Sequence, residues 1–344
     1  MSLKSAFERH LPLIEAELRE VLATPHPQLA SFYGMMRYHL GWIDESFAPT
    51  RGGGGKRLRP VLCLLACQAT GGDPDQALPA AAAIELVHNF SLVHDDIEDR
   101  SHLRRGRPTV WKVWGVSQAI NVGDGLFALA HLAMQRLADR GVPAGRVLTA
   151  LEILDQACLA LTEGQHLDLS FEARLDVGVD EYLSMIRGKT AALFSAAAQL
   201  GALIAGSDHE STTRYRRFGQ NLGLAFQIVD DVLGIWGDPQ VTGKPAASDI
   251  QQRKKTLPIV RALEEEQKRG GRGLREIYQR ETIDEEAVGV ALNILEDLGV
   301  RRYAEEMAND YYRQALVELD AVGMGNEAQG DLRELAAFLV ERTY

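Results

Sequence analysis

The sequence predicts an all-α helical bundle. Alanine and leucine dominate the apolar positions, while β-branched runs with the two-residue alternation of a half-buried strand are scarce. Clusters of glycine and proline recur along the chain and divide it into segments of helical length. No shift in composition and no short internal repeat marks a second domain. We therefore expect many helices around one core, as one all-α domain over residues 1–344.

The expected helices lie between the glycine and proline clusters. Clear breaks are TPHPQ (24–28), RGGGGK (51–56), GGDPD (71–75) and GDPQVTGKPAASD (237–249), because these residues favour turns over regular structure. We expect helices over residues 5–22, 28–47, 57–70, 75–98, 116–139, 144–170, 179–187, 190–205, 209–235, 255–268, 283–298, 300–320 and 330–342.

Composition and charge exclude several classes of protein. The 344 residues are 46% hydrophobic and 25% charged, which is typical of a globular protein with a real core. The net charge of −11 argues against general nucleic-acid binding. Cys63, Cys67 and Cys158 lack a second pair at zinc spacing, so we expect reduced core residues. The N-terminus does not resemble a signal peptide, and no apolar run reaches the roughly 20 residues of a membrane span. We expect a cytoplasmic protein.

An acidic cluster ends the apolar segment around residues 75–98. Asp95 and Asp99 are four residues apart, so on a helix they share a face. His88 precedes them by seven and eleven residues, offsets that return to within roughly 20° of the same line. Like charges at this spacing repel, and hard oxygen ligands favour Mg²⁺. For an isolated DDxxD, however, a solvated helix end paired to the neighbouring arginines would be the more usual interpretation.

A second aspartate pair strengthens the metal hypothesis. Asp230 and Asp231 end the apolar segment GLAFQIVDDVLG, and Gln227 precedes Asp230 by three residues on the same face. Two apolar helices that each end in paired aspartates are improbable by chance in one helical chain. If the two pairs faced each other across a bundle, they would line one metal-binding cavity.

Four basic segments accompany the two acidic ones. The glycines of GGGGKRLRP let backbone approach a phosphate, and arginine can grip a phosphate with two donors. The segment is not a P-loop, because no Ser or Thr follows its lysine. Any one basic run is usually a solvated face. Four of them in a chain of net charge −11 indicate an anionic ligand bridged by Mg²⁺, and a diphosphate is the obvious candidate. The basic residues are Lys56, Arg57, Arg59, Arg104, Arg105, Lys189, Lys244, Lys254 and Lys255.

Five motifs together carry a family resemblance. GGKRLRP, HDDIEDRSHLRRGRPT, GKTAALF, FQIVDDVLG and GKPAASDI follow one another along most of the chain. In this order they resemble the trans-type polyprenyl diphosphate synthases, in the farnesyl and geranylgeranyl diphosphate synthase group. The resemblance implies an isoprenoid-synthase-type helical bundle around a central cavity, usually as a homodimer. It also implies that an allylic diphosphate ionises and condenses with isopentenyl diphosphate, followed by loss of a proton.

The resemblance assigns roles to individual residues. Asp95 and Asp99 would coordinate Mg²⁺ on the allylic diphosphate with support from Asp96, and Asp230 would hold a further Mg²⁺ aided by Asp231. Two further sets would bind the two diphosphates, and Thr190 and Gln227 would present oxygen dipoles to the reacting carbons. The implied isopentenyl diphosphate site is Lys56, Arg59, His88 and Arg105, and the implied allylic diphosphate site is Arg104, Lys189, Lys244 and Lys254.

Product length and one departure from the family pattern complete the expectations. Bulky residues just before the first aspartate motif limit the chain in this family, and here Phe90 and Ser91 occupy those positions. Without the two-residue insertion typical of bacterial farnesyl diphosphate synthases, the pattern points to geranylgeranyl diphosphate, with a C15 or longer product as the alternative. Gly234 stands where the last Asp of the second motif is expected. If that absence merely loosens a metal, Gly234→Asp should lower the Mg²⁺ requirement.

Two other functions remain open from the sequence. A terpene cyclase on the same fold would share the first motif, but its second motif needs a serine where Arg313 stands. A non-catalytic partner subunit is the other possibility. Such subunits commonly lose the first motif or the basic residues, and this chain keeps both.

Overall fold

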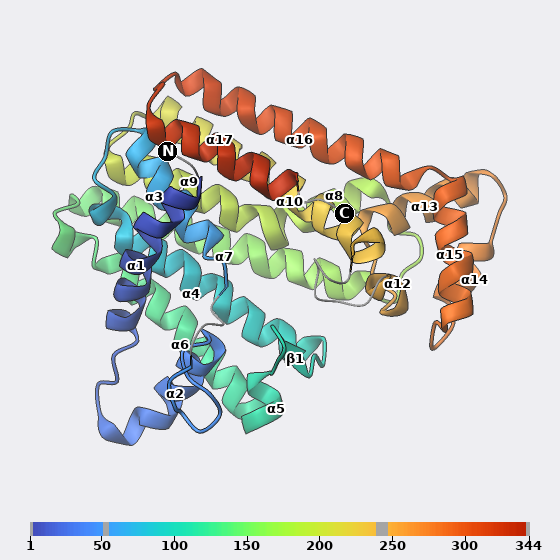
Figure 1. Ribbon diagram of the computed structural model, residues 1–344, viewed down its shortest axis with the longest axis horizontal. Coiled ribbons are helices and arrows are strands. Elements are labelled where there is room, and N and C mark those ends of the chain that lie inside the picture. Colours follow the sequence, from blue (N-terminus) through green and yellow to red (C-terminus); the bar gives the residue numbers. More distant parts are fainter. Residues whose placement is uncertain (1–2, 51–54, 239–246, 342–344) are drawn as a thin grey trace. The chain divides into compact units, whose positions relative to one another are not determined.

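The computed structural model describes residues 3–50, 55–238 and 247–341, and helices account for most of them (Figure 1). This confirms the predicted all-α fold. The contacts group the chain into two compact units. Unit 1 comprises Met1–Asp155, Ala196–Thr213 and Met324–Leu332, and unit 2 comprises Gln156–Ser195, Arg214–Gly323 and Arg333–Tyr344. The expectation of a single domain stays a prediction.

The described elements follow one another along the chain in this order. The first half of the chain forms α1 (Leu3–Val21), η1 (Pro27–Leu29), α2 (Ala30–His39), α3 (Leu58–Ala69), α4 (Pro74–Glu98), β1 (Leu103–Arg104), β2 (Arg107–Pro108), α5 (Val110–Trp114), α6 (Val116–Gln135), η2 (Ala138–Arg140) and α7 (Ala144–Phe171). The second half forms α8 (Val179–Ile186), the π-helical turn η3 (Arg187–Ala191), α9 (Ala192–Ala205), α10 (His209–Trp236), α12 (Ser248–Gln251), α13 (Leu257–Lys268), α14 (Gly273–Tyr278), α15 (Glu285–Asp297), α16 (Val300–Val322) and α17 (Glu327–Val340).

Helix α4 organises unit 1. Its start is set by Asp73, whose side chain accepts a hydrogen bond from the Asp75 amide at 3.0 Å, and by Pro74 in the first turn. Nearly every residue from Ala77 to Val93 is buried, because α4 packs against α1, α3 and α6. Figure 1 shows α4 and α6 side by side. A Cβ on Gly123 of α6 would lie 2.1 Å from His94 Nε2, so glycine allows close approach beside the acidic end of α4.

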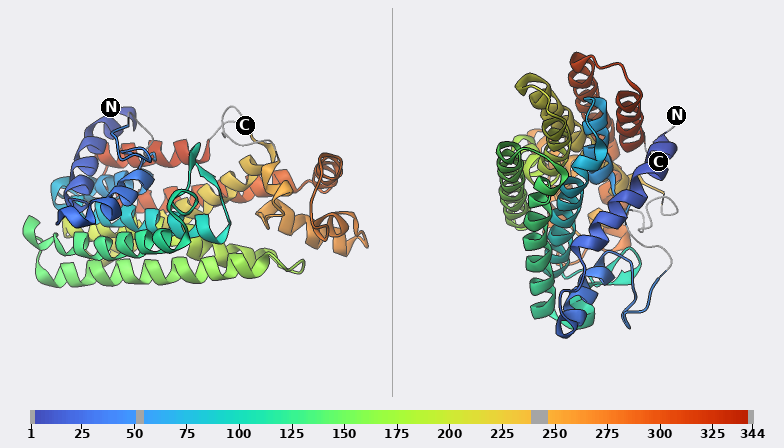
Figure 2. Two further views of the ribbon diagram at one scale, coloured as in Figure 1. Left: turned by 90° about the horizontal axis from the view of Figure 1, so that it is seen from below. Right: turned by 90° about the vertical axis from the view of Figure 1, so that its left-hand side faces the viewer.

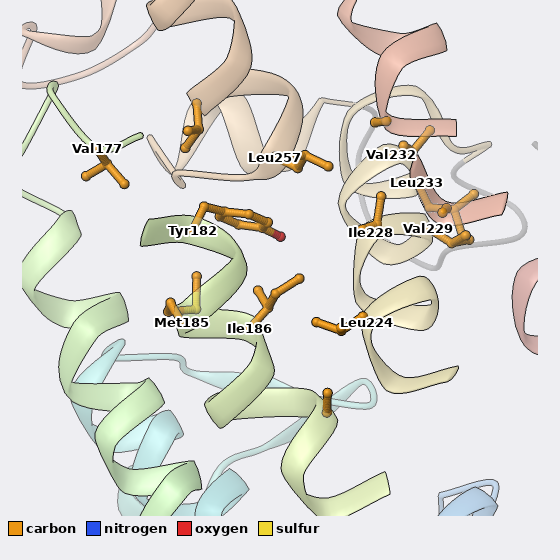
Figure 3. Packing of buried hydrophobic residues seen from close by; sticks show 14 of the residues in the cluster. Val177, Tyr182, Met185, Ile186, Leu224, Ile228, Val229, Val232, Leu233 and Leu257 are labelled. Atoms are coloured by element: carbon orange, nitrogen blue, oxygen red, sulfur yellow. The ribbon is translucent and has the colours of Figure 1, made fainter. Parts of the chain in front are cut away.

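Unit 2 has two apolar clusters. In the first, Tyr182 of α8 lies among Ile186, Leu224, Ile228 and Leu257, with its hydroxyl oxygen directed toward α10 (Figure 3). The second cluster joins α12 and α13 to α14 and α15, and these last three helices pack beside one another (Figure 2). These clusters fix the ends of α8 and α10, from which several predicted site residues project.

Most predicted helices are present, with a few differences. Helix α2 ends at His39 and not at residue 47, because Gly41 takes a φ of 82° and the chain turns into an isolated bridge between Ile43 and Pro49. The short helices α5, α12 and α14 and the hairpin β1–β2 were not predicted. Arg105 and Gly106 both have positive φ, 52° and 74°, as a two-residue hairpin turn requires.

The three cysteines are buried and form no disulfide among the described residues, as predicted. Within the described residues, one helical stretch, Val179–Ala205, passes the length and hydropathy test for a membrane span, although the sequence predicted none. Of its most apolar window, 67% is buried inside the protein. Core helices of globular proteins commonly pass the same test, so this stretch is weak support for a span.

Candidate active site

The last turn of α4 carries the first aspartate motif. Asp95 is half-buried and Asp99 is exposed, and the Asp99 amide donates to the Asp95 carbonyl oxygen at 2.8 Å. Their spacing within one helix places both carboxylates on one face, as the sequence predicted. Both are oxygen donors that solvent and a ligand can reach, which suits a divalent metal that keeps several waters.

Asp96 differs from its two neighbours. It is 1% exposed and accepts a hydrogen bond from Arg104 Nε at 2.8 Å, while its buried Oδ2 has no hydrogen-bond partner among the described residues. Burial raises the pKa of Asp96 to about 6, and the Arg104 guanidinium opposes that shift. Asp96 therefore ties the acidic helix end to the hairpin that carries the arginines.

A basic pocket lies beside this helix end in the same unit. The β1–β2 hairpin presents Arg104 and Arg105, and a Cβ on Gly55 would lie 2.6 Å from Arg105 Nη2. The guanidinium of Arg105 thus lies directly against Gly55. A residue with a side chain at position 55 would clash with it. Of the residues that the sequence assigned to isopentenyl diphosphate, Arg59 and Arg105 both lie close enough to His88 to lower its pKa, and Lys56 directly follows Gly55 in the chain.

Electrostatics in this pocket favour an anion. Burial lowers the pKa of His88 well below its usual value, and Arg59, Arg105 and Arg104 add to the effect. Burial lowers the pKa of Arg59 to about 10, so this guanidinium remains charged at neutral pH. His39, which the sequence did not single out, has a lowered pKa for the same reasons and lines the pocket with Arg104 and Arg105. Several cations around neutral imidazoles suit a multiply charged ligand.

In unit 2, a π-helical turn positions Lys189 and Thr190. A Cβ on Gly164 would lie 2.1 Å from the Lys189 amide, and one on Gly188 would lie 2.5 Å from the Ala160 carbonyl, so α7 and η3 pack with backbones in contact. Lys189 donates to Asp168 on α7. π-Bulges often occur at functional sites because they redirect side chains. Asp168 is a second residue that the sequence analysis missed, although it lies in the segment GQHLDL.

The second aspartate motif has one accessible and one buried member. Asp230 is exposed, whereas Asp231 accepts hydrogen bonds from Tyr182 and from the Leu257 amide, the latter at 2.8 Å. Gln227 Nε2 donates to Asp231 at 3.0 Å, and its Oε1 accepts from Thr190 Oγ1 at 2.7 Å. Burial raises the pKa of Asp231 to about 7. Asp230 is therefore the better placed of the pair to meet a metal, and Asp231 secures the helix end.

Gly234 is explained by a neighbouring carboxylate. A Cβ at this position would lie 1.9 Å from Asp249 Oδ2, so the Asp249 side chain occupies the space that an aspartate at 234 would enter. Asp249 is 8% exposed and lies 3.9 Å from Lys254 Nζ. An aspartate at position 234 would therefore clash with Asp249, so Gly234→Asp would not simply add a metal ligand. The sequence could not show this conflict.

Lys244, which the resemblance assigns to the allylic diphosphate, lies outside the described residues.

The predicted floor residues lie on the buried side of α4. Phe90 is 8% exposed and packs edge-on against Phe127 of α6, with ring centroids 5.2 Å apart. Ser91 Oγ donates to the His88 carbonyl oxygen at 2.8 Å. Phe90 thus joins α4 to α6, and Ser91 is held by its own helix.

The chain has an all-α fold with acidic and basic groups gathered at the end of α4, and comparison with known proteins gives the family. The polyprenyl synthetase family matches residues 41–295. The chain is 40% identical to the (2E,6E)-farnesyl diphosphate synthase of Mycobacterium tuberculosis over 96% of this chain and 90% of that one. Its identity to the geranylgeranyl diphosphate synthase of the same organism is 48%, over 72% of this chain and 66% of that one.

A solved structure agrees with these relatives. The polyprenyl synthetase of Streptomyces coelicolor A3(2) superposes with a TM-score of 0.90 and 39% identity, covering 98% of this chain and 100% of that one. The chain therefore belongs to the polyprenyl synthetase family. It is a trans-type prenyl diphosphate synthase, a prenyltransferase that elongates prenyl chains, as the motifs indicated.

Proposed function

We propose that this enzyme condenses isopentenyl diphosphate with an allylic diphosphate and uses Mg²⁺. The observation that carries the proposal is the end of α4, where Asp95 and Asp99 share a face beside a pocket lined by the half-buried Arg104 and the exposed Arg105 in the same unit. Acidic groups that hold a metal and basic groups that hold phosphate are both needed when a diphosphate must be bound and then released.

The carboxylates of each unit are suited to magnesium. In unit 1, Asp95 and Asp99 offer accessible carboxylate oxygens without thiolates, the donor type that Mg²⁺ prefers, and in unit 2 Asp230 offers another. The described residues contain no group of three or more His, Cys, Asp or Glu side chains arranged for a metal. Mg²⁺ in proteins is usually held by one or two carboxylates together with water and substrate oxygens. When bound, Mg²⁺ would stabilise the charge of the departing diphosphate.

The basic residues would bind the diphosphates and orient them. Arg59 stays charged while half-buried, so it can bind an anion with little competition from water. Lys189 would exchange Asp168 for a phosphate oxygen as the allylic substrate enters. Thr190 Oγ1 donates a hydrogen bond to Gln227 Oε1. The lone pairs of the Thr190 oxygen would therefore be left to face an allylic cation. The resemblance also assigns Arg104 of unit 1 and Lys254 of unit 2 to the allylic diphosphate, together with Lys244, which lies outside the described residues.

The decisive experiment is turnover by the purified protein alone. Isopentenyl diphosphate would be incubated with each allylic primer and Mg²⁺, and the products identified by mass. We expect elongation by five-carbon units without any partner protein. Hydrolysis or cyclisation without elongation would contradict the proposal. A cyclase is disfavoured because Arg313, where that class needs a serine, is paired with Asp310.

We further propose a C20 product. The support is Phe90 just before the first aspartate motif, which is 8% exposed and packs edge-on against Phe127 of α6. The likeness to a farnesyl diphosphate synthase over nearly the whole chain makes a C15 product the specific alternative. The product analysis above separates the two.

We also propose that the enzyme is a cytoplasmic homodimer. Support for the dimer comes from large apolar side chains exposed on α6 and the first part of α7. Ile120, Phe127, Leu132 and Leu148 are 44%, 37%, 55% and 69% exposed. Exposed apolar residues concentrated in two successive helices are more typical of an interface than of a solvated face.

A further inference from the structure

Arg57 stands inside the basic segment GGGGKRLRP, yet it does not face solvent. Its side chain is 1% exposed, whereas the preceding Lys56 is an exposed residue. Arg57 Nε donates to Glu15 Oε1 at 2.9 Å, and Nη1 donates to Glu85 Oε1 at 2.7 Å. A guanidinium committed to two carboxylates in this way is not available to a substrate diphosphate.

Each of these carboxylates is itself fixed by another donor. Glu15 of α1 accepts from Trp42 Nε1 at 2.7 Å, and Glu85 of α4 accepts from Asn89 Nδ2 at 2.8 Å. Glu85 is 2% exposed. Arg57 therefore links the basic segment to two helices through side chains that have little freedom to move.

The backbone at Arg57 needs this support. Its φ is 49°, in the left-handed region that disfavours residues with a Cβ, and its carbonyl oxygen accepts from the Val61 amide at 3.1 Å to begin α3. Lys56 precedes this bend, and Arg59 follows it by two residues. The direction in which the two cations leave the backbone thus depends on the conformation of Arg57.

Glu85 also affects the charge of the pocket. It lies close enough to Arg59 and Arg105 to favour the protonated form of both guanidinium groups. Without this carboxylate, the half-buried Arg59 and the exposed Arg105 would repel one another with less compensation.

We infer that Arg57 is a positioning residue for isopentenyl diphosphate binding. Held by Glu15 and Glu85, it fixes the bend at 57 so that Lys56 and Arg59 converge on one diphosphate. This inference rests on the proposed function, since it takes the Lys56 and Arg59 pocket as the isopentenyl diphosphate site.

The test compares Arg57→Lys with a matched ion-pair variant. Arg57→Lys keeps the positive charge, but a lysine ammonium lacks the planar guanidinium that donates to Glu15 and Glu85 at the same time. Arg136→Lys is the control, because Arg136 Nε pairs with Glu17 of the same helix α1 at 2.9 Å in the same unit, away from the basic segment. We expect Arg57→Lys to raise KM for isopentenyl diphosphate about tenfold and to change KM for the allylic substrate less than twofold.

A direct binding measurement complements the kinetics. Calorimetric titration with isopentenyl diphosphate alone should show a Kd raised by a similar factor in Arg57→Lys and unchanged in Arg136→Lys. Both variants are expected to lower Tm. If Arg57→Lys lowers Tm with unchanged KM and Kd, or raises both KM values equally, the residue is only a structural brace and the inference fails.

Two further variants keep the result interpretable. If Arg57→Lys does not fold, Glu15→Gln removes one carboxylate charge and leaves the Arg57–Glu85 pair intact, and it should give a smaller rise in the same KM. Lys56→Ala tests the site itself. If Lys56→Ala does not weaken isopentenyl diphosphate binding, the proposed site assignment is wrong, and this outcome is distinct from failure of the Arg57 inference.

Discussion

At the scale of single residues, the second aspartate motif shows how a neighbouring side chain restricts which residue a position can hold. Gly234 lacks the carboxylate that the family pattern places there, and Asp249 Oδ2 lies where its Cβ would be. We therefore expect Gly234→Asp to lower both stability and activity, because two carboxylates would compete for one buried space.

The reciprocal swap tests this explanation. The double variant Gly234→Asp with Asp249→Gly returns one carboxylate to the motif and should recover much of the loss, so the two substitutions should be strongly non-additive. The measurements are Tm with and without Mg²⁺ and inorganic diphosphate, together with kcat. Additive losses would show that the two positions do not share this space. Glu98→Gln, an exposed change on α4, serves as the control.

Asp95 gives the prediction for the first motif. Asp95→Ala should lower kcat by several orders of magnitude, because charge held by a metal acts mainly in the transition state. Chelation of Mg²⁺ should abolish turnover of the unaltered enzyme. Full activity in excess chelator would contradict metal dependence, and a loss of similar size in Glu98→Gln would mean that any damage to this helix end is sufficient.

At this scale the sequence predicted residue types better than residue partners. The spacing of Asp95 and Asp99 follows from helix geometry alone, so it could be predicted. The burial of Asp96 against Arg104 could not, because it depends on a hairpin turn that places Arg105 at positive φ. The sequence analysis missed Asp168 and Asp249 because each is recognised only by a neighbour that is distant in sequence. Asp168 accepts a hydrogen bond from Lys189, and the side chain of Asp249 lies against Gly234.

At the scale of elements, the packing of α1 on α3 buries a histidine. His10 is 1% exposed and contacts Gln68 through Nε2 at 2.9 Å, and burial lowers its pKa. The unfolded chain binds this proton near pH 6.5, so stability should fall as pH drops below that value, by at most about 1.4 kcal/mol per pH unit for one histidine.

The variant His10→Gln should flatten this dependence. Denaturant unfolding at pH 7.5 and at pH 5.5 would give the two free energies of unfolding, and their difference should be smaller in the variant than in the unaltered protein. His39 and His88 also have lowered pKa values, so part of the pH dependence should remain. An unchanged difference would mean that His10 is protonated as readily in the folded state as in the unfolded one.

The contact between α4 and α6 carries the prediction of product length. Phe90→Ala removes the ring that meets Phe127, so the space between the two helices should open and products should shift toward twenty-five carbons and beyond. Mass analysis of the products is the measurement. Phe338→Ala, a change at an exposed ring of α17, should leave the distribution unchanged. The unaltered product distribution in Phe90→Ala would place the limit elsewhere.

Long helices could be predicted and short ones could not. α4, α6 and α7 carry continuous apolar patterns between glycine and proline breaks, and these features are local. The sequence predicted helix through residue 47, but the chain leaves the helix after His39 and Trp42 Nε1 donates to Glu15, a contact that no local pattern reveals. Tertiary contacts therefore decided the places where sequence patterns failed.

At the scale of the whole molecule, the exposed apolar residues of α6 and α7 give the last prediction. Leu132 and Leu148 are 55% and 69% exposed in a single chain, which is costly unless another surface covers them. In a two-fold dimer the same patch on each chain would cover the other, so one substitution acts twice. Leu148→Glu, or the double variant with Leu132→Glu, should therefore shift the protein from dimer to monomer in sedimentation velocity experiments.

Val317→Glu is the matched control, because Val317 is 65% exposed on α16. A dimer that survives both α6 and α7 substitutions, or a monomeric unaltered protein, would show that these side chains are not the interface.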